Sequence, residues 1–160
     1  MELHRCIYSP AFGDFRAAAE RYGYQASPEQ IGWSLPVYVA DTDDEAMGQA
    51  LPHLDFLFNT LMRMPKDVFF PAGYLTLASS ARVMAGKKGL GSGNADVRDL
   101  VERGYALVGS AETVRQRIES YQKELGFGLF SGIFQFGSLP GELFRSSVRR
   151  FADKVMPQLR

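Results

Sequence analysis

The pair Gly109-Ser110 has the residue types and the position that an anion-binding turn requires. It lies in the segment GYALVGSAETV (104–114), where a short apolar run ends and an amphipathic helical pattern begins. This pattern predicts a strand, a turn and a helix, with Ser110 as N-cap and Thr113 in the first turn. The first backbone N–H groups of such a helix have no partner within it, so they could bind a phosphate. The alternative is an ordinary helix cap without a ligand.

Gln135 and Gly137 form a second pair that could contact a ligand. They lie at the end of segment 130–137, which we expect to be the last strand of the fold. A polar side chain next to a bare backbone allows close approach of a ring or a substrate. The alternative is a strand that simply ends at this point.

Three basic residues, Arg82, Lys87 and Lys88, could close over an anionic group as part of a lid. They belong to the stretch 65–103, which we expect to be a mobile insertion because glycines are dense between residues 86 and 94. A lid of this kind acts by excluding water from a bound ligand. Charged side chains of a solvated loop are the alternative.

Four carboxylates follow the first expected strand: Asp41, Asp43, Asp44 and Glu45. Acidic residues are favoured at the start of a helix by its dipole, and we therefore expect a helix start and no metal site here. His4, His53 and Cys6 do not have the spacing of a zinc site or a nucleophilic triad. No catalytic residue is predicted.

The elements that would position these residues alternate between helix and strand. The expected helices cover 12–22, from the four carboxylates to about 62 with a kink or break at Pro52, 114–125, and 139 to about 157. The expected strands cover 33–40, the run before Gly109, and 130–137. Such alternation predicts an α/β fold with parallel strands and right-handed crossovers, in a single domain covering residues 1–160.

The composition limits the kind of partner that we expect. The chain has 160 residues, 46% of them hydrophobic, and 18 basic residues balance 18 acidic ones. No long-range field would therefore attract nucleic acid or an anionic membrane. The lone Cys6, an amino terminus without an apolar signal and the lack of a long apolar run lead us to expect a cytoplasmic protein. A three-stranded parallel sheet leaves edges and faces uncovered, so we also expect a homo-oligomer, at least a dimer.

Three motifs in order resemble a known family. They are YVADTDDEA (38–46), ALVGSAETV (106–114) and FADKVMP (151–157), and together they resemble the carboxyl-terminal half of luciferase-like flavin-dependent monooxygenases. The resemblance covers nearly the whole chain. It implies a partial (β/α)8 TIM barrel, in which the three strands resemble the sixth to eighth and the stretch 65–103 resembles the family's mobile region over the active site.

The resemblance also implies a cofactor and a reaction. Members of the family use reduced FMN, or in some branches a deazaflavin, to activate oxygen or to move hydride on a small-molecule substrate. The first five strands supply most flavin contacts in the family, and they have no counterpart here. We therefore expect a truncated or fragmentary oxidoreductase that needs other chains to complete a flavin site. The alternative is a non-catalytic dimerisation or interaction module derived from the same fold.

Overall fold

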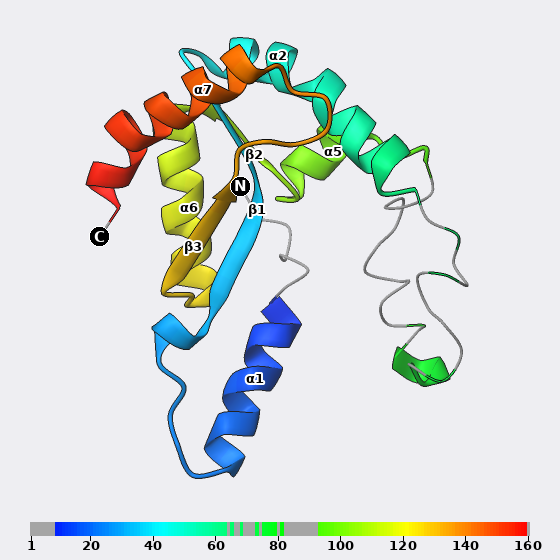
Figure 1. Cartoon of the computed structure of the whole chain (residues 1–160). Helices are drawn as coiled ribbons and strands as arrows, with labels where there is room; N and C mark the ends of the chain where they lie inside the picture. Colours follow the sequence, from blue (N-terminus) through cyan, green and yellow to red (C-terminus); the bar gives the residue numbers. More distant parts are fainter. Residues whose placement is uncertain are drawn as a thin grey trace.

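The computed structural model describes residues 9–63, 65, 68, 73, 75–79, 81 and 93–159. In this part of the chain, helices pack on both faces of a parallel sheet (Figure 1). The strands are β1 (Gly32–Ala40), β2 (Leu107–Ser110) and β3 (Leu129–Ile133). The α-helices are α1 (Ser9–Arg21), α2 (Asp43–Asp55), α5 (Val97–Glu102), α6 (Ala111–Leu125) and α7 (Gly141–Arg150). Shorter helical segments are η1 (Pro28–Gln30), η2 (Phe56–Leu61), η3 (Phe151–Val155) and η4 (Met156–Gln158).

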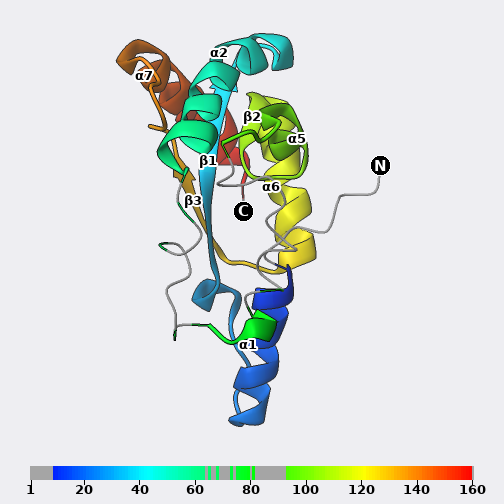
Figure 2. The ribbon, with the colours of Figure 1, turned by 90° about the vertical axis from the view of Figure 1, so that its right-hand side faces the viewer.

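The three strands lie in the order β2-β1-β3 and all pairs are parallel (Figure 2). The expected α/β class with three parallel strands is therefore confirmed. Three consecutive strands of a barrel would place the second strand in the middle, whereas here the first strand is central. The length of β1 explains this order, because residues 32–36 pair with β3 and residues 37–40 pair with β2.

The two faces of the sheet are covered by different helices. Side chains of β1 alternate between the faces, as in any strand. Trp33, Leu35, Val37 and Val39 pack with residues of α6 and η3. Tyr38 and Ala40 pack with residues of α2 and α5. The connection from β1 to β2 and the connection from β2 to β3 run in opposite directions across the sheet, so right-handed crossovers place α2 and α6 on opposite faces.

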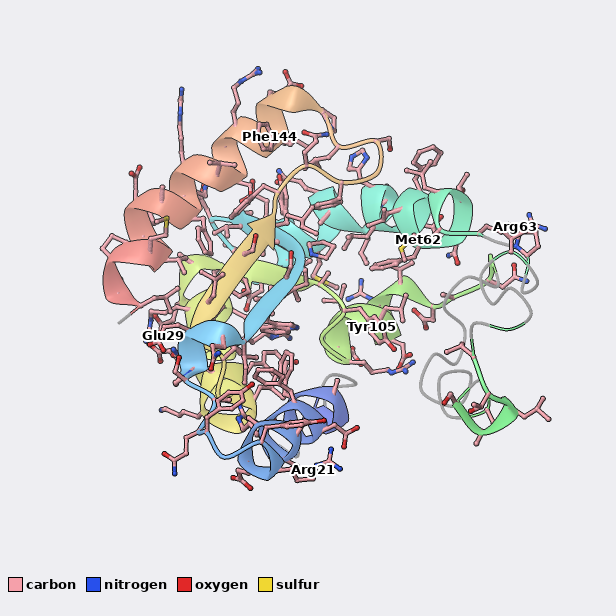
Figure 3. The ribbon with its side chains drawn as sticks, turned by 60° about the horizontal axis from the view of Figure 1, so that its bottom comes forward. Arg21, Glu29, Met62, Arg63, Tyr105 and Phe144 are labelled. Atoms are coloured by element: carbon pink, nitrogen blue, oxygen red, sulfur yellow. The ribbon has the colours of Figure 1, made fainter. Side chains whose placement is uncertain are left out.

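The expected long helix passes through Pro52 and then changes form. Proline has no N–H, so one hydrogen bond of the helix is missing at that position. Four residues later the Phe56 N–H bonds to the carbonyl groups of His53 and Pro52, and η2 continues as a wider π-helical turn. Met62 and Arg63 follow its end (Figure 3).

Helix α5 lies inside the stretch that we expected to be an irregular insertion. Asp96 caps this helix by accepting bonds from the backbone N–H groups of Arg98 and Asp99. Its buried side chains are Val97, Leu100 and Val101, and they join the α2 side of the core. Arg82, Lys87 and Lys88 lie outside the described residues, as does most of the stretch 64–92.

Ser147 of α7 completes the hydrogen bonding of β1. The Val39 N–H lies at a level of the sheet beyond the residues of β1 that pair with β3. It donates to the Ser147 hydroxyl over 2.9 Å, and Ser147 is fully buried. A buried N–H group without a partner is costly, so this hydroxyl takes the place of a strand neighbour.

Replacing Ser147 with alanine is expected to lower the free energy of unfolding by about 1–3 kcal/mol, because the Val39 N–H loses its buried acceptor. Urea unfolding measures this loss, and hydrogen exchange of the Val39 amide is expected to become faster. Ser34→Ala, at an exposed position of the same strand, is the matched control and is expected to change stability little. An equal effect of the two substitutions would contradict the role of Ser147.

Candidate functional site

Gly109 and Ser110 are the last residues of β2, and α6 begins directly after them, so the strand passes into the helix at this turn. The Ser110 hydroxyl accepts a hydrogen bond from the Thr113 backbone N–H over 3.3 Å, so Ser110 is the N-cap of α6. The Ser110 backbone N–H donates to Asp43 Oδ1 over 2.6 Å. The Thr113 hydroxyl donates to Asp43 Oδ2 over 2.9 Å. A carboxylate from the start of α2 therefore occupies the position at which an anionic ligand would contact this turn.

The lack of a side chain at Gly109 permits this contact. A Cβ atom at Gly109 would lie 2.9 Å from Asp43 Oδ1 and 2.9 Å from Thr113 Cγ2, which is closer than such atoms approach. The backbone hydrogen bond from Ser110 lowers the pKa of Asp43 below its usual 3.8, and hydrogen bonds from Thr113 and the charge of Arg117 act in the same direction. Asp43 is thus held as an anion.

A second group of polar contacts joins the carboxyl end of β1 to α7. Asp41 receives two hydrogen bonds from Arg150, at 2.9 and 2.6 Å, and Lys154 lies 3.9 Å away. The Arg150 guanidinium holds the pKa of Asp41 below its usual value. Arg150 also bonds to the Ser146 hydroxyl. This ion pair links two segments that are 109 residues apart in the sequence.

Tyr38 begins a chain of hydrogen bonds next to this ion pair. Its hydroxyl donates to Gln49 over 2.7 Å, and the Gln49 amide donates to Glu45 over 2.9 Å. Glu45 in turn accepts from the Asp41 backbone N–H over 3.3 Å. Burial raises the pKa of Tyr38, so this hydroxyl is protonated at neutral pH. Asp41, Asp43 and Glu45 thus each have partners within the chain, and no group of three metal-binding side chains occurs among the residues described.

Gln135 and Gly137 lie in the loop after β3, because the strand ends at Ile133 and not at Gly137 as expected. The exposed Gln135 side chain donates to the Leu139 carbonyl over 2.9 Å. Gly137 has a φ of 53°, and a Cβ atom there would overlap the carbonyl oxygen of His53. The bare backbone of Gly137 therefore allows the loop to contact α2. His53 also bonds to the Ser138 hydroxyl over 2.9 Å through Nδ1.

The two predicted pairs do not meet in one site. Gly109-Ser110 contacts α2 through Asp43, and Gly137 contacts the same helix at His53. These two positions are ten residues apart, which corresponds to about 15 Å along a helix. Sequence reasoning placed Thr113 in the first turn of this helix, but it missed Asp43 and Arg150 as partners. Of these two, only Asp43 gave a signal, as a member of the acidic run.

Aromatic residues near these loops belong to the core. The buried Trp33 ring contacts Tyr121, Phe127 and Phe130, with ring centres 4.9, 5.3 and 5.7 Å away. On the other face, the buried Tyr105 and the half-buried Phe144 pack with the α2 side of the core (Figure 3). These rings are therefore part of the hydrophobic core.

The comparison with protein families agrees with this fold. The sequence profile of the luciferase-like monooxygenases matches residues 7–127. This chain belongs to the luciferase-like monooxygenase family. No curated protein matches the chain.

Two solved structures of luciferase-like monooxygenases share the fold. Monooxygenase RslO1 from Streptomyces bottropensis is 22% identical, with a TM-score of 0.61 over 93% of this chain and 37% of its own. The second is the oxygenating constituent of 3,6-diketocamphane monooxygenase from Pseudomonas putida, a type II Baeyer-Villiger monooxygenase in complex with FMN. It is 20% identical, with a TM-score of 0.65 over 95% of this chain and 40% of its own. The chain thus spans about two fifths of the length of these monooxygenases, and the expected partial-barrel likeness is confirmed.

Within the described part of this luciferase-like chain, no helix has both the length and the apolar character of a bilayer-spanning segment.

Replacing Gly137 with alanine is expected to lower the free energy of unfolding by about 2 kcal/mol or more, because a Cβ atom would strain the backbone and overlap His53. Chemical unfolding measures the change. Gly48→Ala in α2 is the control, since open space surrounds that position and alanine is expected to stabilise the helix by about 0.5–1 kcal/mol. A neutral effect of Gly137→Ala would show that the loop does not need its close contact with α2.

Stability is expected to fall as the solution becomes acidic, in part because Asp41 and Asp43 are protonated. Both groups have a lowered pKa in the folded chain, so their contribution is complete above the unfolded value of about 3.8 and is lost as the pH falls through the folded value. Urea unfolding at several values from about pH 5 to pH 2 is expected to show a shallower slope for the double variant Asp41→Asn, Asp43→Asn than for the wild type. Asp44→Asn, which removes a neighbouring exposed carboxylate, serves as the control.

Proposed function

We propose that this chain is one part of a flavin-dependent monooxygenase of the luciferase-like family and forms a flavin site only together with other chains. The proposal rests on one combined observation. The chain belongs to the family, and it covers 37% of the length of one of the two monooxygenases and 40% of the other. The FMN bound to the Pseudomonas putida protein supports FMN as the flavin. A small organic molecule that accepts oxygen is the proposed class of substrate.

The residues predicted to contact the cofactor do not fit FMN in this chain alone. The Ser110 N–H group already donates to Asp43, so a flavin phosphate at this turn would lie beside a carboxylate of the same sign of charge. The space at Gly137 is filled by the backbone of α2. We therefore assign no reaction step to the isolated chain. The oxygen chemistry of these enzymes belongs to the flavin, and the protein supplies binding and orientation.

The uncovered part of the sheet supports a requirement for other chains. Leu129 and Ile133 of β3 share a face and are 60% and 45% exposed. Gly32 and Pro36 of β1 pair with them in register, and the exposed pair of Ser34 with Ser131 lies between, so this end of the sheet face is exposed and partly apolar. Exposed apolar surface and free strand edges favour association. We propose that the chain forms a homo-oligomer, at least a dimer, and that it acts in the cytoplasm, as its lone cysteine suggests.

A non-catalytic interaction module is the second candidate. It is favoured by the internal bonding of Asp41, Asp43 and Gln135, since these polar groups at the loops already have partners within the chain. Flavin absorbance of the purified protein separates the two candidates. A yellow protein supports the enzyme, and a colourless folded dimer supports the module.

The isolated monomer is expected to bind FMN with a Kd weaker than about 100 µM, because Asp43 already takes two donors of the turn and would repel the phosphate. A fluorescence titration of FMN measures the affinity, and light scattering on the same sample reports the oligomeric state, expected to be at least a dimer at high concentration. Micromolar binding of FMN by a monodisperse monomer would contradict the proposal. A hen egg-white lysozyme sample of equal concentration gives the background quenching.

A further inference from the structure

The geometry points to Asp43 as a built-in substitute for a phosphate at the start of α6, which closes this turn to the phosphate groups of ligands. The inference deepens the proposed function and rests on it for the choice of FMN as one of the ligands. It concerns the residues of this chain alone and is tested without an assay of activity.

The Asp43 carboxylate uses two of the donors that a phosphate bound at this turn would use. A phosphate at a helix N-terminus accepts bonds from free backbone N–H groups and from hydroxyl groups of the first turn. Here one carboxylate oxygen accepts from the Ser110 N–H over 2.6 Å, and the other accepts from the Thr113 hydroxyl over 2.9 Å. Gly109 lets the carboxylate approach, because any Cβ atom there would lie 2.9 Å from Oδ1. Both oxygens thus match donors of the turn.

The start of α2 holds this carboxylate in place. Asp43 is the first residue of α2, and the hydroxyl of the preceding N-cap, Thr42, accepts from the Glu45 N–H over 3.2 Å. The start of α2 is therefore fixed on its own, and it lies 67 residues from Ser110 in the sequence. A phosphate that binds the Ser110 N–H and the Thr113 hydroxyl must displace two charge-assisted hydrogen bonds, and it would then lie next to a negative charge. Both effects oppose phosphate binding in the wild-type chain.

The inference also explains why the turn keeps an anion-binding sequence without needing a ligand. A helix N-terminus favours a negative charge, and α6 is 15 residues long. In this chain the charge comes from another helix and also ties β2 and α6 to α2. Glycine, serine and threonine at the turn are therefore required by a contact within the chain.

The test follows backbone amide signals of the full-length, isotope-labelled protein by NMR during titration with inorganic phosphate and, separately, with FMN. Sodium chloride keeps the ionic strength constant. The samples are the wild type, Asp43→Ala and Asp44→Ala, which removes a neighbouring exposed carboxylate as the matched control. We expect no saturable shift of the Ser110 amide in the wild type and in Asp44→Ala. In Asp43→Ala we expect a saturable shift, with an apparent phosphate affinity at least about tenfold tighter than any response of the wild type, which corresponds to about 1.4 kcal/mol.

Two results would overturn the inference. The first is a saturable shift of the Ser110 amide signal in the wild type, with the same phosphate affinity as in Asp43→Ala. The second is the lack of any phosphate-dependent shift of this signal in the Asp43 variants. If Asp43→Ala does not fold, Asp43→Asn is used, because it keeps an acceptor oxygen and removes the charge that repels phosphate. Micromolar FMN binding by the wild-type monomer with no shift at Ser110 would contradict the proposed function and leave this inference standing, so the two failures are distinguishable.

Discussion

The two-sided pairing of β1 is the constraint on which the rest of the structure depends. Nine residues of one strand bond to β3 along the first half and to β2 along the second half. On the side of β1 that faces β2, residues 32–36 therefore have no neighbouring strand in the described part of the chain. On the side that faces β3, residues 37–40 have none there. The buried Ser147 hydroxyl satisfies one N–H group that this arrangement exposes, and the ion pair of Arg150 with Asp41 holds α7 beside the same end of the strand. The position of α7 thus follows from the unmet hydrogen bonding of β1.

The polar groups at the carboxyl ends of the strands have partners within the chain. In α/β proteins this edge of the sheet is where ligands bind, because loops and helix N-termini converge there. Here Asp43 bonds to the turn after β2, Arg150 bonds to the residue after β1, and His53 bonds to the loop after β3. These contacts stabilise the domain by joining α2 and α7 to the loops after the strands.

Local features of the fold could be predicted from the sequence, and contacts between distant segments could not. Ser110 as the cap of α6 and the end of that helix at Leu125 follow from residue type and spacing, and both are confirmed. The long helix through Pro52 also follows from its apolar spacing. The central position of β1 could not be predicted, because helices and strands alternate along the chain in the same way whether β1 or β2 is the central strand. The bond between Asp43 and Ser110 joins residues 67 positions apart, so the acidic run could be interpreted only as a helix start. Helix α5 has six residues, too few for a clear periodic pattern.

Helix α2 has a mechanical consequence because it is attached near both of its ends. Asp43 fastens it to the junction of β2 and α6, and His53 fastens it to the loop that precedes α7. A helix resists stretching, so a displacement of either attachment is transmitted to the other as movement of a rigid rod. Pro52 removes one main-chain bond next to the second attachment, and the rod is expected to flex there first. The turn after β2 and the loop before α7 are thus mechanically coupled through α2.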